Sequence, residues 1–166
     1  MEKPSPAGEA LIADAKKFEK NLLNFFWRQG VSYFEGEDLV QETYLRLWNY
    51  RDRYEPTAKL STFLFTLARQ VRIDALRRQT RRENREEAWG KEQPVAQMPE
   101  TLLREDMRWA VAQLSDPLRE VVELGVFQDL PYAEISAILE IPVGTVKSRM
   151  SNAPKKLTET LDERRS

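Results

Sequence analysis

The 166-residue chain contains no cysteine and no histidine. Without cysteine it can form no disulfide, no thiolate nucleophile and no cysteine-based metal site. Without histidine it lacks the commonest general base and the other common zinc ligand. An enzyme built from this chain would depend on carboxylate, lysine, hydroxyl or tyrosine chemistry, and no constellation of such residues supports one. We therefore predict a protein that is not an enzyme and that uses no metal and no cofactor.

The chain also lacks an apolar run of the roughly 18 residues that a membrane helix needs. Its first ten residues, MEKPSPAGEA, lack the basic-then-apolar order of a signal peptide. These absences predict a cytoplasmic protein without membrane insertion. A hydrophobic content of 41% is still enough for one medium domain or two small ones.

The formal net charge of the whole chain is only −1, but basic and acidic residues are unevenly distributed along it. Residues 1–82 carry 15 basic and 11 acidic residues, residues 83–106 carry 3 and 7, and residues 107–166 carry 8 and 9. A basic first part is thus followed by an acidic middle. Because this middle contains Gly90 and Pro94 and has little periodicity, it is predicted to be a linker between two domains.

Apolar periodicity predicts helices throughout, and no strand pattern is convincing, so the predicted class is all-α. The helices expected in the first part span residues 7–29, 37–50 and 61–82. The helices expected in the second part span residues 101–114, 117–128, 132–139 and 143 onward. We expect Ser61 or Thr62 to cap the third helix, and Phe63 to lie in the core.

The segment PYAEISAILEIPVGTVKSRM, residues 131–150, has the pattern of a helix-turn-helix. In such a unit the N-terminal part of the second helix enters the major groove of DNA. The groove-facing residues would be Val143, Gly144, Thr145, Lys147, Ser148 and Arg149. An ordinary helical hairpin with a solvated face is the alternative for this segment taken alone.

Pro154 falls where the second helix of this unit should still be running. It removes one backbone hydrogen bond and disfavours a continuous helix by about 3 kcal/mol. We expect the groove-facing turns to survive, and the tail from Ala153 to kink or to restart with Ser151 or Asn152 as its cap.

Three blocks carry a resemblance to a known family: EDLVQETYLRLWNYRDRY (37–54), KLSTFLFTLARQVRIDALRR (59–78) and LPYAEISAILEIPVGTVKSRM (130–150). In this order they resemble bacterial RNA polymerase sigma factors of the sigma-70 family, in the extracytoplasmic-function (ECF) group. The resemblance implies two small helical domains joined by the acidic linker. Region 2, a bundle of three to four helices, would occupy residues 1–82, the linker 83–104, and region 4, a four-helix domain with the helix-turn-helix, 105–166.

The resemblance also implies roles for residues of region 2. The helix with the D-x-x-Q-E motif would bind the clamp helices of the polymerase β′ subunit through Asp38, Gln41, Glu42, Arg46 and Trp48. The third helix and the loop before it would melt the promoter −10 element and hold its unstacked bases and phosphates. The residues implied there are Tyr54, Lys59, Ser61, Thr62, Arg69, Gln70, Ile73, Arg77 and Arg78. For any single residue of these sets, an ordinary solvated surface is the alternative.

In region 4 the resemblance implies that the groove-facing residues named above read the −35 element, and that the domain contacts the polymerase β flap. The family often has arginine where this chain has Asn152 and Pro154, which predicts weaker phosphate contacts. It often has glycine where this chain has Glu140, and a left-handed backbone there would cost up to about 1 kcal/mol.

The predicted function is that of a sigma factor, which binds core RNA polymerase, directs it to specific promoters and promotes DNA opening. Its expected partners are the polymerase and promoter DNA, and the family adds an anti-sigma protein as a further candidate. Two alternatives stay open. One is a stand-alone helix-turn-helix regulator, which would need a dimer and a palindromic site. The other is an adaptor that binds polymerase without initiating transcription.

Overall fold

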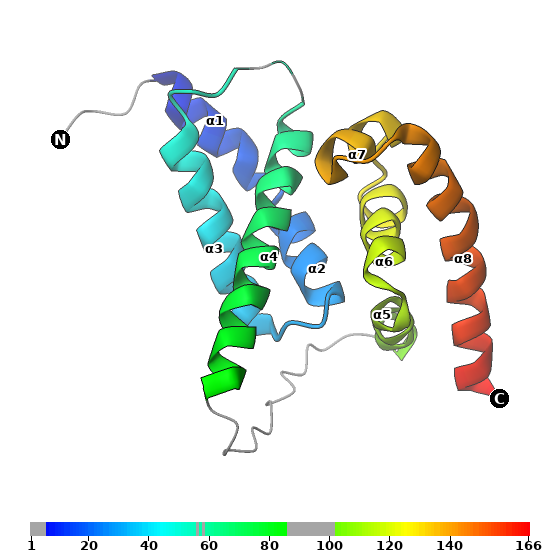
Figure 1. Ribbon diagram of the computed structural model, residues 1–166. Helices are drawn as coiled ribbons and strands as arrows, with labels where there is room; N and C mark the ends of the chain where they lie inside the picture. Colours follow the sequence, from blue (N-terminus) through cyan, green and yellow to red (C-terminus); the bar gives the residue numbers. More distant parts are fainter. Residues whose placement is uncertain (1–5, 56, 58, 86–101) are drawn as a thin grey trace. The chain divides into compact units, whose positions relative to one another are not determined.

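The computed structural model of the chain describes residues 6–55, 57, 59–85 and 102–166 (Figure 1). These residues form helices, turns and loops, with no strand among them, so the predicted all-α class is confirmed. None of the described helices is both long and apolar enough to cross a bilayer. Most of the predicted linker, including Gly90 and Pro94, lies outside the described residues.

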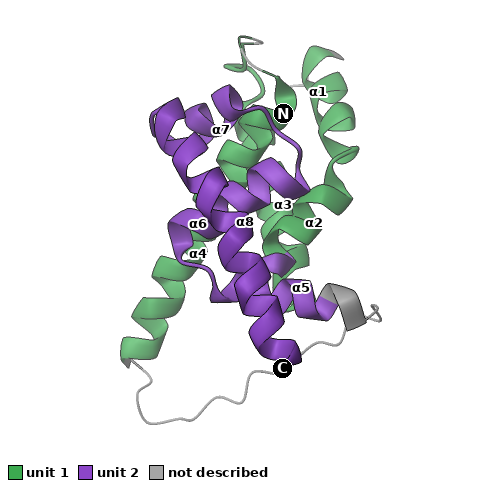
Figure 2. Ribbon diagram, turned by 90° about the vertical axis from the view of Figure 1, so that its right-hand side faces the viewer, with its two compact units in different colours: residues 1–26, 32–97 green, residues 27–31, 98–166 purple. Residues whose placement is uncertain are grey.

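The chain divides into two compact units, coloured separately in Figure 2. Unit 1 comprises residues 1–26 and 32–97, and unit 2 comprises residues 27–31 and 98–166. The helices of unit 1 are α1 (Pro6–Lys16), most of α2 (Glu19–Arg28), α3 (Tyr33–Tyr50) and α4 (Leu60–Arg85). Those of unit 2 are α5 (Leu102–Gln113), α6 (Asp116–Val122), the π-helical turn η1 (Glu123–Phe127), α7 (Tyr132–Leu139) and α8 (Val143–Arg165).

The single helix predicted at residues 7–29 is wrong, because the chain forms α1 and α2 instead. At the break, the amides of Lys17 and Phe18 donate to carbonyls three residues earlier, at 3.2 and 3.0 Å. No proline or glycine marks this point, and the apolar spacing continues across it. Ala15 before the break and Leu22 after it are both fully buried.

α3 begins at Tyr33 rather than at residue 37 because Ser32 caps it. The Ser32 hydroxyl accepts a hydrogen bond from the Glu35 amide at 3.2 Å, with the serine-to-glutamate spacing typical of helix N-termini. The buried face of α3 contains Gly36, Leu39, Val40, Thr43 and Leu47. This burial fixes which side of α3 turns outward.

α4 begins at Leu60, so Ser61 and Thr62 lie inside its first turn and neither caps it. The prediction of a cap at these residues is therefore wrong. The first turn is closed by the Lys59 carbonyl, which accepts from the Phe63 amide at 3.2 Å.

The core aromatic of α4 is Phe65 rather than Phe63. The Phe65 ring is buried 5.6 Å from that of Phe25. Phe63 is half-buried between the rings of Tyr50 and Tyr54, at 5.1 and 5.3 Å. The expectation of Phe63 in the core is thus wrong. Residues two positions apart lie on nearly opposite sides of an α-helix, so Phe63 and Phe65 cannot both face the core.

In unit 2, η1 carries a carboxylate into the interior. Glu123 is 1% exposed and accepts two hydrogen bonds from the Arg28 guanidinium, both at 2.8 Å, and one from Gln128 at 3.2 Å. Arg28 also lies 4.0 Å over the Phe127 ring. Burial raises the pKa of Glu123, and the hydrogen bonds from Arg28 act in the opposite direction. Both residues belong to unit 2, but 95 positions separate them, so the sequence alone gave no sign of this pair.

α7 and α8 form the predicted helix-turn-helix. Ile135, Ile138 and Val146 are buried in its core. Between the helices Glu140 has φ 55° and ψ 44°, so the left-handed turn position is occupied by a glutamate. The Ser136 hydroxyl donates to the Ile141 carbonyl at 2.5 Å and braces this turn.

α8 continues as one helix from Val143 to Arg165 with Pro154 inside it, and Figure 1 shows its ribbon without a break. The predicted kink or restart from Ala153 is therefore wrong. The Pro154 side chain is exposed, whereas its neighbour Ala153 is fully buried, and α8 as a whole packs on α5, α6 and α7. We attribute the continuity to this packing, which offsets the single hydrogen bond that a proline removes.

Candidate functional site

The outward side of α3 presents part of the D-x-x-Q-E motif to solvent. Asp38 and Gln41 are exposed, whereas Glu42, Arg46 and Trp48 are half-buried. Trp48 is held from one side by Arg51, whose guanidinium lies 4.0 Å over the indole and donates to the Trp48 carbonyl at 2.7 Å. The motif therefore divides into residues open to a partner and residues engaged within unit 1.

The engaged residues form a chain of alternating charges between α3 and α4. Arg46 Nη2 donates to Glu42 Oε1 and to Asp74 Oδ2, each at 2.8 Å, and Arg78 Nη2 donates to Glu42 Oε2 at 3.1 Å. We call these four residues the α3–α4 ion network. Sequence reasoning missed Asp74, because a partner 28 positions away is visible only once the packing of the two helices is known.

This network controls the ionisation of Glu42. Partial burial acts to raise the pKa of Glu42, but the hydrogen bonds from Arg46 and Arg78 outweigh it and hold the pKa below its ordinary value. Glu42 is consequently charged at neutral pH. Its two carboxylate oxygens each accept from a different arginine, so the network fixes the spacing of α3 and α4 at this level.

Four of the residues predicted for the −10 element lie at or just before the start of α4. Tyr54 is brought to the helix by its ring contact with Phe63, Lys59 is exposed and Ser61 is half-buried. Thr62 is buried, and its hydroxyl has no hydrogen-bond partner among the described residues. Thr62 therefore faces the interior of unit 1, whereas Lys59 is open to solvent.

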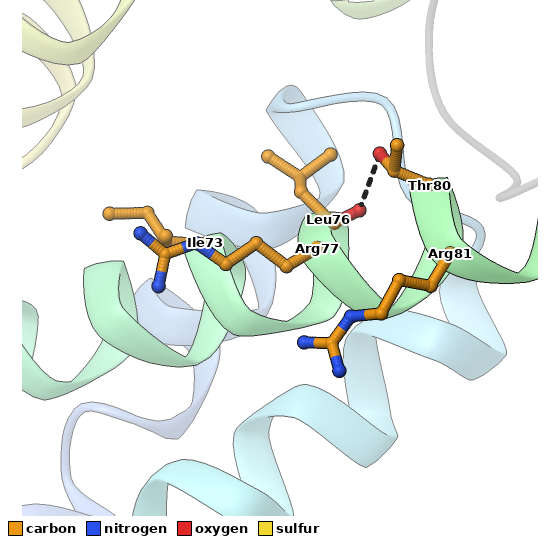
Figure 3. A pocket seen from close by; sticks show the side chains of 5 residues that line it. All are labelled: Ile73, Leu76, Arg77, Thr80 and Arg81. Carbon is orange, nitrogen blue, oxygen red and sulfur yellow. Dashed lines mark hydrogen bonds between the residues drawn. The ribbon is translucent and has the colours of Figure 1, made fainter.

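The other residues predicted for the −10 element follow along α4. Gln70, Arg77 and Arg78 are exposed, and Arg69 and Ile73 are half-buried. A shallow hollow of about 420 Å³ is lined by Ile73, Leu76, Arg77, Thr80 and Arg81. Figure 3 shows its two guanidinium groups turned back toward the start of α4. An apolar floor beside two guanidinium groups can hold an unstacked base and its phosphates.

The first two turns of α8 bring all six predicted groove-facing residues together. Val143, Gly144, Lys147 and Ser148 are exposed, and Thr145 and Arg149 are half-buried. A Cβ placed on Gly144 would meet no atom within 4 Å, so the backbone there is open to close approach. We call this surface the α8 face. It offers two cations, hydroxyl groups and a bare backbone to a groove.

Comparison with known proteins shows which family this chain resembles. Residues 16–82 match the model of sigma-70 region 2, and residues 104–157 match that of sigma-70 region 4. The ECF RNA polymerase sigma factor RpoE of Cereibacter sphaeroides is 28% identical over 156 residues, covering 91% of this chain and 86% of the relative. The ECF RNA polymerase sigma factor SigL of Mycobacterium tuberculosis is 36% identical over 135 residues, covering 78% and 76%.

Solved structures agree with these relatives. The sigma factor RpoE of Bartonella quintana, determined in complex with the anti-sigma factor NepR, has a TM-score of 0.79 at 26% identity, covering 90% of this chain and 95% of that one. CnrH, determined with the cytosolic domain of CnrY, shares the fold with a TM-score of 0.69 at 21% identity. The chain thus belongs to the sigma-70 family, within the ECF group of RNA polymerase sigma factors.

Proposed function

We propose that this sigma factor acts in the cytoplasm, without catalysis of its own, by joining core RNA polymerase to promoters through three separate surfaces. Region 2 would comprise residues 1–82, the linker 83–104 and region 4 residues 105–166. The family matches at 16–82 and 104–157 support this division. The observation that carries the proposal is that the helix-turn-helix leaves its α8 face open while α4 presents a row of arginines.

Polymerase binding is assigned to α3, with the β′ clamp helices as the partner. Asp38 and Gln41 are exposed and would meet the partner directly. Glu42 and Arg46 are held by the α3–α4 ion network and would meet it as a pre-formed charged edge, which limits the entropy lost on binding. Trp48, stacked under Arg51, supplies an aromatic rim.

Promoter melting is assigned to the start and middle of α4. The exposed Lys59, Gln70, Arg77 and Arg78 would hold phosphates, and the hollow beside Ile73 would take an unstacked base. Tyr54, Ser61 and Arg69 complete the candidate surface. Thr62 would act from inside, by shaping the first turn of α4, because its side chain is buried.

Recognition of the −35 element is assigned to the α8 face. Val143, Thr145 and Ser148 suit contacts to base edges, and Lys147 and Arg149 suit contacts to bases or phosphates. The open backbone at Gly144 would allow the helix to approach the groove closely. Region 4 would also contact the β flap of the polymerase.

An anti-sigma protein is a further proposed partner, because the RpoE structure named above is a complex with an anti-sigma factor. Purification of the chain from its native cells under non-inducing conditions would test this. A stoichiometric inhibitory protein is expected to copurify, and active factor without one would contradict the proposal.

The function is tested by transcription with purified core polymerase on a fragmented library of the source genome, followed by sequencing of transcript 5′ ends. Discrete start sites that share two upstream motifs are expected. Binding to core without new start sites would instead favour an adaptor. A stable dimer that binds a palindrome without polymerase would favour a stand-alone regulator.

A further inference from the structure

α3 carries a line of four exposed side chains that the D-x-x-Q-E motif covers only in part. The line consists of Phe34, Asp38, Gln41 and Leu45, and we call it the outer stripe of α3. Their spacings of four, three and four residues place them along one side of the helix. Phe34 is 72% exposed and Leu45 61%, more than any other large apolar side chain in the described part of the chain.

Other sides of α3 are engaged within unit 1. Leu39 and Leu47 are buried in the core, and Arg46 on one flank is bonded to Asp74 of α4. On another flank the Tyr44 hydroxyl donates to the Ala15 carbonyl of α1 at 3.1 Å. Because these contacts fix the rotation of α3 about its axis, the outer stripe points away from the core of unit 1.

Single exposed apolar residues are common on proteins and need no special explanation. Here, however, Phe34 and Leu45 bracket Asp38 and Gln41, the two motif residues that are free of the α3–α4 ion network. Eleven residues of α-helix separate the two apolar side chains, or about 16 Å. That length matches about three turns of a helix lying alongside, with an apolar anchor at each end and polar groups between.

We infer that core RNA polymerase lies along the outer stripe, with Phe34 and Leu45 as its apolar anchors. This inference rests on the proposed binding of polymerase by α3. It moves the centre of that interface away from Glu42 and Arg46, which are committed to α4, toward the opposite edge of the motif. A few well-packed residues carry most of the binding energy of an interface, even when many other residues make contact.

The charge of α3 favours a basic protein surface over nucleic acid as the occupant. Glu35, Glu37 and Asp38 lie on or next to the outer stripe and are exposed, and the one basic residue of α3, Arg46, is held by two carboxylates. These acids would repel phosphates at short range and attract lysine or arginine. A helical polymerase element with basic and apolar side chains meets both requirements.

The test is the affinity of the full chain for purified core polymerase after single substitutions. Phe34→Ala is expected to weaken binding about tenfold or more, and Leu45→Ala about fivefold. Phe34→Leu should restore most of the affinity, because it keeps an apolar anchor. The matched control is Val126→Ala on η1, which removes another exposed apolar side chain, 50% exposed, that belongs to none of the proposed binding surfaces and should leave the affinity unchanged.

Thermal unfolding of all four variants should match that of the wild type, because the replaced side chains are exposed. Wild-type affinity in Phe34→Ala and Leu45→Ala, together with loss of binding in Asp38→Arg, would overturn the anchors while leaving polymerase binding by α3 intact. Failure of the wild-type chain to bind core would instead overturn the proposed function. A wild-type dimer that Phe34→Ala dissolves would assign the stripe to a second copy of the chain.

Discussion

The two polar surfaces at α3–α4 and at α8 are built in opposite ways. Across α3 and α4, Glu42, Arg46 and Arg78 hold one another and Asp74 through hydrogen bonds of 2.8 to 3.1 Å. On the α8 face, the candidate contact residues project from a helix that is fixed by buried residues behind them, such as Val146 and Ala153. The α3–α4 ion network therefore helps to hold its unit together. The α8 face does not, because its side chains only project from a helix that other residues hold in place.

Because of this difference, function and stability can be changed separately on the α8 face but not in the α3–α4 ion network. A substitution on the α8 face would remove a proposed contact to DNA and leave the core behind it intact. A substitution in the α3–α4 ion network would remove a proposed contact to a partner and also weaken the ion pairing of the partly buried groups that remain.

Lys147→Glu should have the largest effect on function and almost none on stability. Reversing a charge at the groove is expected to lower transcription from a −35-dependent promoter more than tenfold, through lost contact and new repulsion of phosphates. The free energy of unfolding should change by less than about 0.5 kcal/mol, because the side chain is exposed. Abortive transcription and urea unfolding measure the two quantities.

Lys155→Glu is the matched control for this prediction, because Lys155 is an exposed lysine of the same helix, beyond the α8 face. It should retain most of the transcription. Equal losses in both variants would mean that the α8 face acts through general charge rather than through specific contact.

Pro154→Ala should stabilise unit 2 by about 1–2 kcal/mol. The helix already continues through this position, so alanine adds an amide that can donate to the Met150 carbonyl and removes the steric cost of the ring. Transcription should be unchanged, since the α8 face lies upstream. Urea unfolding, with Lys155→Ala for comparison, measures the gain, and a loss of stability would show that the proline ring itself makes necessary contacts.

Arg46→Met, in the α3–α4 ion network, should lower both the stability of unit 1 and the affinity for core polymerase. It removes the hydrogen bonds to Glu42 and Asp74 and leaves two acids close to each other, at a cost of about 1 kcal/mol for side chains that are partly exposed. Affinity for core should fall in parallel. Arg81→Met, which removes an arginine of the same unit outside the network, should leave both unchanged.

The sequence was sufficient for the features that depend on local pattern. Periodicity predicted the helix-turn-helix, and its start at Tyr132 and second helix from Val143 agree with the structure. It could not reveal the break after Lys16, where the apolar spacing runs on, nor the continuity of α8 at Pro154, where tertiary packing outweighs a local preference. It also could not pair Arg46 with Asp74, because that contact depends on how two helices pack.

The smallest predicted effect is the pH dependence of the α3–α4 ion network. Because the pKa of Glu42 in the folded chain lies below its ordinary value of 4.5, its contribution to stability is fully present above that value and is lost as the pH falls through the folded pKa. Glu42→Gln lacks this contribution at every pH. The difference in free energy of unfolding between wild type and Glu42→Gln should therefore be constant from neutral pH to about pH 5.5 and shrink below pH 4.5.

Urea unfolding of both proteins across this range measures the difference, with Glu83→Gln on α4 as a variant that makes the same charge change outside the network. At neutral pH, Glu83→Gln should change the free energy of unfolding by less than about 0.5 kcal/mol, because the Glu83 side chain is exposed. If the Glu42→Gln difference grew on acidification, the folded chain would bind the Glu42 proton more tightly than the unfolded chain. The effect of burial on the pKa of Glu42 would then be larger than that of the two arginines. The ion pairs of the network would in that case not stabilise the packing of α3 on α4.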